Sequence, residues 1–175
     1  QSIFPYQANG SLMVNKGKVI GSELIGQQFS DEGFMKGRPS AVNYNTYTAK
    51  EKSEDKYLGV ASGSQNLSPS NPLLKKRVES DLQNFLNNNP SINKKDIPTD
   101  LLTSSGSGLD PSISQQSALI QIPQISKSTG ISVDNLRKII DKNTQNKTLG
   151  FLGEKTVNVL KVNLEIYNQL SEKSD

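Results

Sequence analysis

The chain has 175 residues, which is enough for one folded domain with its own core. It contains no Cys, His or Trp, which excludes disulfides, thiolate or imidazole metal sites and histidine-dependent nucleophilic catalysis. Twenty Lys and Arg residues against 17 Asp and Glu residues give a net charge of +3, and the two signs are mixed along the chain. Because nucleic-acid binding needs basic residues gathered on one surface, this mixture disfavours a nucleic-acid partner.

The N-terminal region predicts a hairpin. Two apolar runs, 12–14 and 19–20, flank the short glycine-containing turn at 15–18. Before them, the apolar and aromatic residues 1–6 are interpreted either as a first strand or as the membrane-proximal edge of the domain. No segment reaches the ~18–20 apolar residues that would span a bilayer, and no signal peptide is recognisable.

The middle of the chain predicts an irregular region followed by a helix. Residues 30–72 are polar and are expected to form an ordered, irregular excursion. Its four aromatic anchors are Phe34, Tyr44, Tyr47 and Tyr57. Ser68 and Pro69 resemble a helix start, and apolar residues then recur every three to four positions until the segment 87–90 ends the helix.

A strand and a second helix are expected next. Residues 97–103 are typical of a short strand, and 104–110 form a Gly/Ser loop. Ser112 and Ser114 are candidate caps of the second helix, with Gln115 in a capping-box relation to Ser112. Inside that helix Pro123 removes a hydrogen bond and predicts a kink, and Gly130 ends it.

The last third predicts one more helix and a strand. A helical face recurs from Val133 to near Asn143. Residues 160–166 alternate apolar and polar, which favours a strand, although a helix burying Val159, Val162 and Ile166 is the alternative. The segment 171–175 is expected to be a disordered tail. Together these elements predict a single α+β domain, with a mixed β-sheet, an N-terminal hairpin and about three helices.

Two similar loops are candidates for binding an anion. Residues 62–70 and 105–112 share the order S-G-S, a short gap, Leu, a capping residue, Pro and Ser, and each precedes a predicted helix. Glycines permit close backbone approach, and a helix N-terminus offers free N–H groups. The alternative is that the serines only cap their own helices. The charge of Asp110 at a helix start would also repel an anion.

Arg38, in the sequence Gly-Arg-Pro-Ser, is the second candidate. Its guanidinium can pair with a carboxylate or phosphate, or it can hydrogen-bond to loop carbonyls in a purely structural role. The carboxylates nearest loops are Asp100, Asp110 and Glu154, whose separation the sequence does not define.

Six segments resemble the KdpC family, the C subunits of bacterial Kdp potassium-transporting ATPases. In chain order they are ANGSL (8–12), GSELIGQQF (21–29), FMKGRPSA (34–41), SGSQNLSPSNP (62–72), SGSGLDPSIS (105–114) and LGFLGEKTVNVLKVNLEI (149–166). They are spread over residues 8–166, which is most of the chain. Two departures are Lys155, where the family usually has Pro, and the looser match over 130–145.

The resemblance implies a topology that composition does not. Family members have one N-terminal transmembrane helix, so 1–175 resembles the extracytoplasmic domain of a single-pass protein of the cell membrane. Their partners are the channel-like potassium-binding subunit and the catalytic P-type ATPase subunit. The chain has no DKTG motif, so it is expected to be no enzyme by itself.

Two roles are implied for the family, and assembly of the pump is the favoured one. The other is a catalytic chaperone that binds nucleotide, without a tightly bound cofactor but with weak affinity for ATP. The residues that would hold ATP are Ser105, Gly106, Ser107, Gly108 and Gln121. Candidate interface residues are Arg38, Asn66 and Asp110. An independent secreted module for a small ligand or anion is the competing interpretation.

Overall fold

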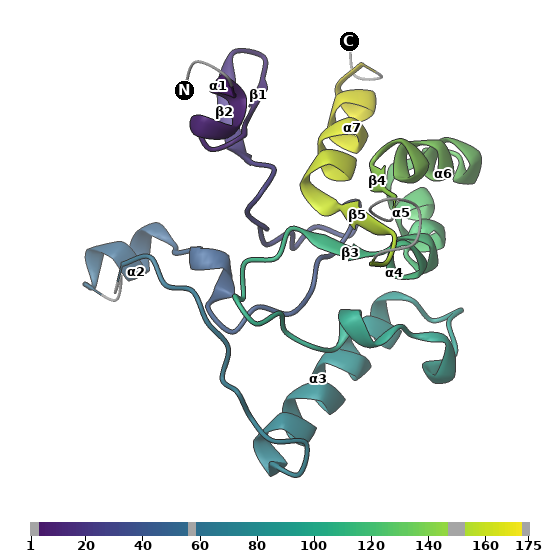
Figure 1. The fold of residues 1–175 in the computed structure, drawn as a ribbon. Helices are drawn as coiled ribbons and strands as arrows, with labels where there is room; N and C mark the ends of the chain where they lie inside the picture. Colours follow the sequence, from purple (N-terminus) through teal and green to yellow (C-terminus); the bar gives the residue numbers. More distant parts are fainter. Residues whose placement is uncertain (1–3, 56–58, 147–152, 173–175) are drawn as a thin grey trace.

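A computed structural model describes residues 4–55, 59–146 and 153–172. Tyr57 and the end of the expected tail therefore lie outside the described residues. The fold is α+β, as predicted (Figure 1). However, the described strands form two separate antiparallel sheets, β1-β2 and β3-β5-β4, where one mixed sheet was expected.

The predicted hairpin is confirmed. Strands β1 (Leu12–Asn15) and β2 (Lys18–Ser22) pair with Val14 opposite Val19. Lys16 and Gly17 both have positive φ, the backbone that a tight two-residue hairpin turn requires. Before the hairpin, Pro5–Ala8 forms the short helix α1, so a first strand is wrong there, because Pro5 begins a helical turn.

Two of the four expected anchors, Phe34 and Tyr44, hold the irregular region in place. Within residues 30–55 and 59–71, the regular elements are a 3₁₀ turn, Asn43–Asn45, and the short helix α2 (Ala49–Ser53). The ring of Phe34 lies 6.1 Å from that of Phe29, and both pack against the core. The hydroxyl of Tyr44 donates to the carbonyl of Arg38 at 2.6 Å.

Helix α3 (Pro72–Asn88) begins three residues later than expected, because Asn71 rather than Ser68 caps it. The Asn71 side chain accepts from the N–H of Leu73 at 2.9 Å, and Pro72 is the first helical residue. The helix ends at Asn88, as predicted. None of its residues is fully buried.

Two expected strands are wrong. Within 97–103 the chain forms a 3₁₀ turn, Thr99–Leu101, which follows Lys94–Asp96, another such turn. Residues 160–166 belong to helix α7 (Val159–Glu172), which includes the first two residues of the expected tail. The buried residues of α7 follow helical spacing, because its broad apolar face packs into the core: Val159, Leu160, Val162, Asn163 and Ile166.

The predicted second helix is broken in two. Ser112 lies in strand β3 (Ser112–Ser114), so only Ser114 is a cap, and it accepts from the N–H of Ser117 at 3.1 Å. The expected capping box with Gln115 is therefore not formed. Helix α4 (Gln115–Ile120) ends before Pro123, and α5 (Ile122–Thr129) starts anew around it. A proline near a helix start costs no hydrogen bond, so a break replaces the expected kink.

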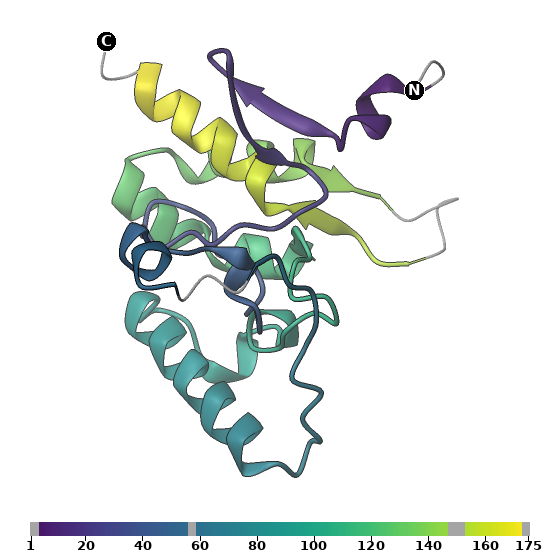
Figure 2. The ribbon, with the colours of Figure 1, turned by 90° about the vertical axis from the view of Figure 1, so that its left-hand side faces the viewer.

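The core comes almost entirely from the C-terminal half. Helix α6 (Val133–Lys142) follows the left-handed cap at Gly130, as predicted. Strands β4 (Thr144–Gln145) and β5 (Thr156–Asn158) complete the small sheet. The buried cluster joins β3, β5, α4, α5, α6 and α7, with Met35 added from the irregular region. Figures 1 and 2 place the hairpin at one end of the molecule and α3 at the other.

Among the described residues, no helix is both long and apolar enough to cross a membrane.

Candidate functional site

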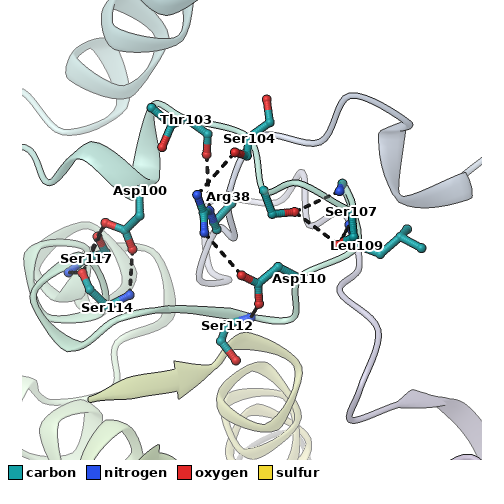
Figure 3. Close-up of polar contacts among 12 residues, drawn as sticks. Arg38, Asp100, Thr103, Ser104, Ser107, Leu109, Asp110, Ser112, Ser114 and Ser117 are labelled. Carbon is teal, nitrogen blue, oxygen red and sulfur yellow. Dashed lines mark hydrogen bonds and ion pairs between the residues drawn. The ribbon is translucent and has the colours of Figure 1, made fainter. Parts of the chain in front are cut away.

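The guanidinium of Arg38 connects its own segment to the loop that contains residues 103–110. Its Nε donates to the carbonyl of Thr103 and its Nη2 to that of Ser104, both at 3.3 Å. Its Nη1 pairs with the carboxylate of Asp110, also at 3.3 Å (Figure 3). The guanidinium thus makes contacts of both anticipated kinds, to loop carbonyls and to a carboxylate, and all of them lie within the chain.

The loop after Ser104 is closed by its own side chains. Ser105 Oγ accepts from the N–H of Gly108 at 2.9 Å, and Ser107 Oγ accepts from that of Leu109 at 3.1 Å. Ser40 Oγ donates to the carbonyl of Gly108 at 2.6 Å. These hydroxyls therefore stabilise the loop itself. Gly106 lies in open space.

The two similar loops lie against each other, which their sequences did not predict. The N–H of Gly63 donates to the carbonyl of Ser107 at 2.8 Å. Gly108 has a φ of +67°, and a Cβ there would lie 2.8 Å from the carbonyl oxygen of Gly63. Asn66 lies further along the first loop and lines a small pocket that also contacts Thr103 and Ser104.

The carboxylate at a helix start is Asp100 and not Asp110. Asp100 Oδ2 accepts from the N–H of Ser114 at 2.7 Å, and Asp100 Oδ1 accepts from the hydroxyls of Ser114 and Ser117 at 3.2 and 2.5 Å. It therefore occupies the positive end of α4. Asp110 instead precedes β3 and accepts from the N–H of Ser112 at 3.0 Å. The role of Asp100 depends on contacts 14 to 17 residues away, which no local pattern reveals.

A polar cleft of about 730 Å³ brings together the residues singled out by charge. Its lining includes Arg38 and all three loop carboxylates, Asp100, Asp110 and Glu154. Within the described residues, no three such groups gather closely enough to hold a metal ion. The cleft therefore combines one cation with three carboxylates on an open surface.

Gln121 is separated from the loop residues with which it was grouped. Its side chain is 4% exposed at the end of α4. Its Oε1 accepts from the N–H of Lys36 at 2.8 Å, and its Nε2 donates to the carbonyls of Lys36 and Ser117 at 3.2 and 3.0 Å. It lines a pocket of about 30 Å³ beside Lys36, where burial lowers the pKa of the lysine.

Tyr44 is the neighbour of Arg38 that the sequence identified only as an anchor. Burial raises its pKa to about 12, and the nearby charge of Asp110 acts in the same direction. Tyr44 also lies against Gly26, whose N–H donates to the carbonyl of Leu109 at 2.8 Å. Tyr44 therefore packs between Arg38 and Gly26 as a neutral group.

Comparison with known proteins tests the resemblance that the sequence motifs indicate. The family model described as "KdpC: K+-transporting ATPase, c chain" matches residues 1–168. The "Potassium-transporting ATPase KdpC subunit" of Clostridium kluyveri is 62% identical over 170 residues, which cover 97% of this chain and 81% of the relative. The subunits of that name from Clostridioides difficile and Bacillus cereus are 55% and 44% identical over 171 residues. These matches cover 95% and 97% of this chain, and 82% of each relative. The chain therefore belongs to the KdpC family, the c chain of the K+-transporting ATPase.

Proposed function

We propose that the chain is a non-catalytic accessory subunit that assembles and stabilises an ATP-driven potassium uptake pump. Its partners in this proposal are the channel-like potassium-binding subunit and the P-type ATPase subunit. The domain acts on the extracytoplasmic side of the cell membrane, held there by a single N-terminal helix. Family membership supports the pump, and the resemblance of the sequence supports the topology.

The observation that favours a scaffold is the internal use of the polar groups around Arg38. Three guanidinium nitrogens are engaged by Thr103, Ser104 and Asp110, and the loop serines bond to backbone groups of the chain. Such bonding holds surface loops in one shape before a partner arrives. A preformed surface loses less conformational entropy on association, which favours stable assembly.

The test is to express the pump with and without this chain. Without it, the other two subunits are expected to separate on size-exclusion chromatography in detergent, and potassium-stimulated ATP hydrolysis is expected to fall with the amount of complex. Recovery of both on adding the purified chain is the positive control. An intact, fully active complex without the chain would refute the assembly role.

Nucleotide binding at the Ser/Gly loop is the competing proposal. The site residues it would use are Ser105, Gly106, Ser107 and Gly108, while the nearby start of α4 already carries the carboxylate of Asp100. Calorimetric titration with ATP at two salt concentrations, with sulfate as the control anion, separates the two roles. Submillimolar ATP binding that sulfate does not reproduce, and that Ser107→Ala abolishes, would favour the chaperone role. Weak binding that sulfate equals and salt removes would favour the scaffold.

A further inference from the structure

A groove between the hairpin and α7 has the size of a small-molecule site. Its volume is about 400 Å³, within the range of pockets that hold small ligands. On one wall Leu160, Leu164 and Tyr167 recur at helical spacing, so they form a stripe of about 10 Å along α7. The opposite wall belongs to the hairpin. A helix and a strand thus flank the groove along its length, and this shape suits a chain-like ligand.

One end of the groove is apolar and is fixed at the base of the hairpin. Ile20 and Phe29 line it together with Leu160. The Nε2 of Gln27 donates to the carbonyl of Ile20 at 2.8 Å, and a Cβ on Gly21 would lie 3.1 Å from the Leu160 side chain. The contact between β2 and the start of α7 therefore leaves no room for a larger residue than glycine at position 21.

The other end of the groove is cationic. Lys16 and Lys18 line it from the hairpin turn, and Figures 1 and 2 both place this turn beside the C-terminal half of α7. Among residues 4–55, 59–146 and 153–172, neither lysine takes part in an ion pair. No described residue that lines the groove is acidic, and Glu165 on α7 pairs instead with Lys142. A ligand with an anionic head and an apolar tail complements these two ends.

We propose that this groove binds a free fatty acid, a single medium-length acyl chain that ends in a carboxylate. The chain lies along the α7 stripe, and the carboxylate meets Lys16 and Lys18 at the hairpin turn. No contact that supports the accessory role is used here, so this inference goes beyond that role and does not depend on it.

Other occupants fit the groove less well. Its volume suits one acyl chain rather than the two of a phospholipid. A polypeptide would bring backbone N–H and carbonyl groups that need partners. Two side-chain amides on the walls, those of Gln27 and Asn163, are already bonded to backbone groups of this chain at Ile20 and Met35.

The test is calorimetric titration of the full chain with decanoate below its micelle concentration. Decan-1-ol and decyltrimethylammonium carry the same tail with a neutral and a cationic head, and each is expected to bind about tenfold more weakly than decanoate. Amide chemical-shift changes in the NMR spectrum locate the ligand. They are expected to concentrate in 15–20 and 160–167.

Two groove variants test the two ends of the ligand. Tyr167→Gln, at a position that is 47% exposed, removes part of the apolar wall and is expected to weaken decanoate binding about tenfold. Lys16→Gln/Lys18→Gln is expected to weaken it about fivefold at low salt and to approach the wild type at high salt, where screening removes the charge contribution.

Two further variants are matched controls and should bind decanoate normally. Val14→Thr/Val19→Thr changes a cross-strand pair on the face of the same hairpin that points away from the groove. Lys94→Gln/Lys95→Gln removes the same net charge from exposed lysines elsewhere. All of the substituted positions are half or more exposed, so the melting temperatures should stay near that of the wild type.

Equal affinity for decanoate and decan-1-ol, or wild-type affinity in both groove variants, would overturn the inference. Equal losses in the groove and control variants would do the same, because they would indicate non-specific adsorption. Binding to phosphatidylglycerol vesicles that Tyr167→Gln abolishes, without binding of decanoate, would assign the groove to a membrane lipid instead. Loss of pump assembly in Tyr167→Gln, again without decanoate binding, would assign it to a subunit contact. Each of these results leaves the accessory role standing.

Discussion

Arg38 illustrates how a residue chosen for its charge holds together two segments that are distant in the sequence. The sequence identified it as a candidate interface residue or, alternatively, as a structural residue that hydrogen-bonds to loop carbonyls. Its half-buried side chain joins Thr103, Ser104 and Asp110. Three charge-assisted contacts at one residue make its loss costly to the fold itself.

We therefore predict that Arg38→Ala lowers the free energy of unfolding of the isolated chain by about 1–3 kcal/mol, because two carbonyls and a carboxylate lose their donor. Urea denaturation measures the change. Arg38→Lys is the control: it retains the charge but cannot reach all three acceptors, so its loss should be smaller. Unchanged stability in Arg38→Ala would return the residue to a pure interface role.

The raised pKa of Tyr44 leads us to predict that stability falls at alkaline pH. Its pKa is raised from 10.0 to about 12 by burial, so the folded state retains the proton after the unfolded state has lost it. The free energy that this raised pKa contributes to folding is fully present below pH 10, and it is lost as the pH rises towards 12. Tyr44→Phe lacks it, so the stability difference between wild type and variant should shrink across that window. A difference independent of pH between 10 and 12 would contradict the raised pKa.

Gly108 predicts a steric requirement at the contact between the two similar loops. Gly108→Ala should destabilise by about 1–3 kcal/mol, because φ is +67° and the new Cβ would meet the Gly63 carbonyl oxygen and the Val42 side chain. Gly106→Ala is the matched control, since nothing lies within 4 Å of its Cβ position. Equal thermal stability of the two variants would show that the loops separate freely.

At the scale of elements, one buried side-chain amide, that of Asn163, fixes the backbone at Met35 in the irregular region to α7. Asn163 is 2% exposed, its Oδ1 accepts from the N–H of Met35 at 2.8 Å, and its Nδ2 donates to the carbonyl of Met35 at 2.9 Å. Gln121 holds Lys36 in the same way from α4. Two side-chain amides thus bond the backbone of residues 35 and 36, which lies outside both described sheets.

We predict that Asn163→Ala costs about 2–4 kcal/mol, because it leaves both backbone groups of Met35 unpaired in the core and opens a cavity. Asn168→Ala, at a half-buried position on the same helix, should change stability by no more than about 0.5 kcal/mol. Chemical denaturation of both variants provides the comparison. Similar small losses would mean that segment 34–36 is held chiefly by Phe34.

At the scale of the whole molecule, stability is expected to be uneven. The core cluster lies in the C-terminal half with Met35, while the hairpin supplies none of it and stands at the opposite end from α3 (Figures 1 and 2). Regions with few buried apolar contacts open locally at low free energy.

Native-state hydrogen exchange should therefore show the amides of β1 and β2 opening far below the global free energy of unfolding, while those of α6 and α7 approach it. Both sets form backbone hydrogen bonds, so protection by hydrogen bonding alone would not separate them. Equal protection in the isolated chain would show that the hairpin is already part of the cooperative unit.

The sequence alone determined the features that depend on local chemistry: the hairpin turn at Lys16 and Gly17, the cap at Gly130, the face of α6 and the family motifs. It misjudged 160–166, because a helix with a broad buried face also places apolar residues at alternate positions. It misplaced the start of α3, because Ser68-Pro69 and Asn71-Pro72 are equivalent cap signals. Only the tertiary structure decided that Arg38 joins two loops and that Asp100 occupies the start of α4. Those contacts join residues 14 to 72 positions apart, so packing and not local preference selects them.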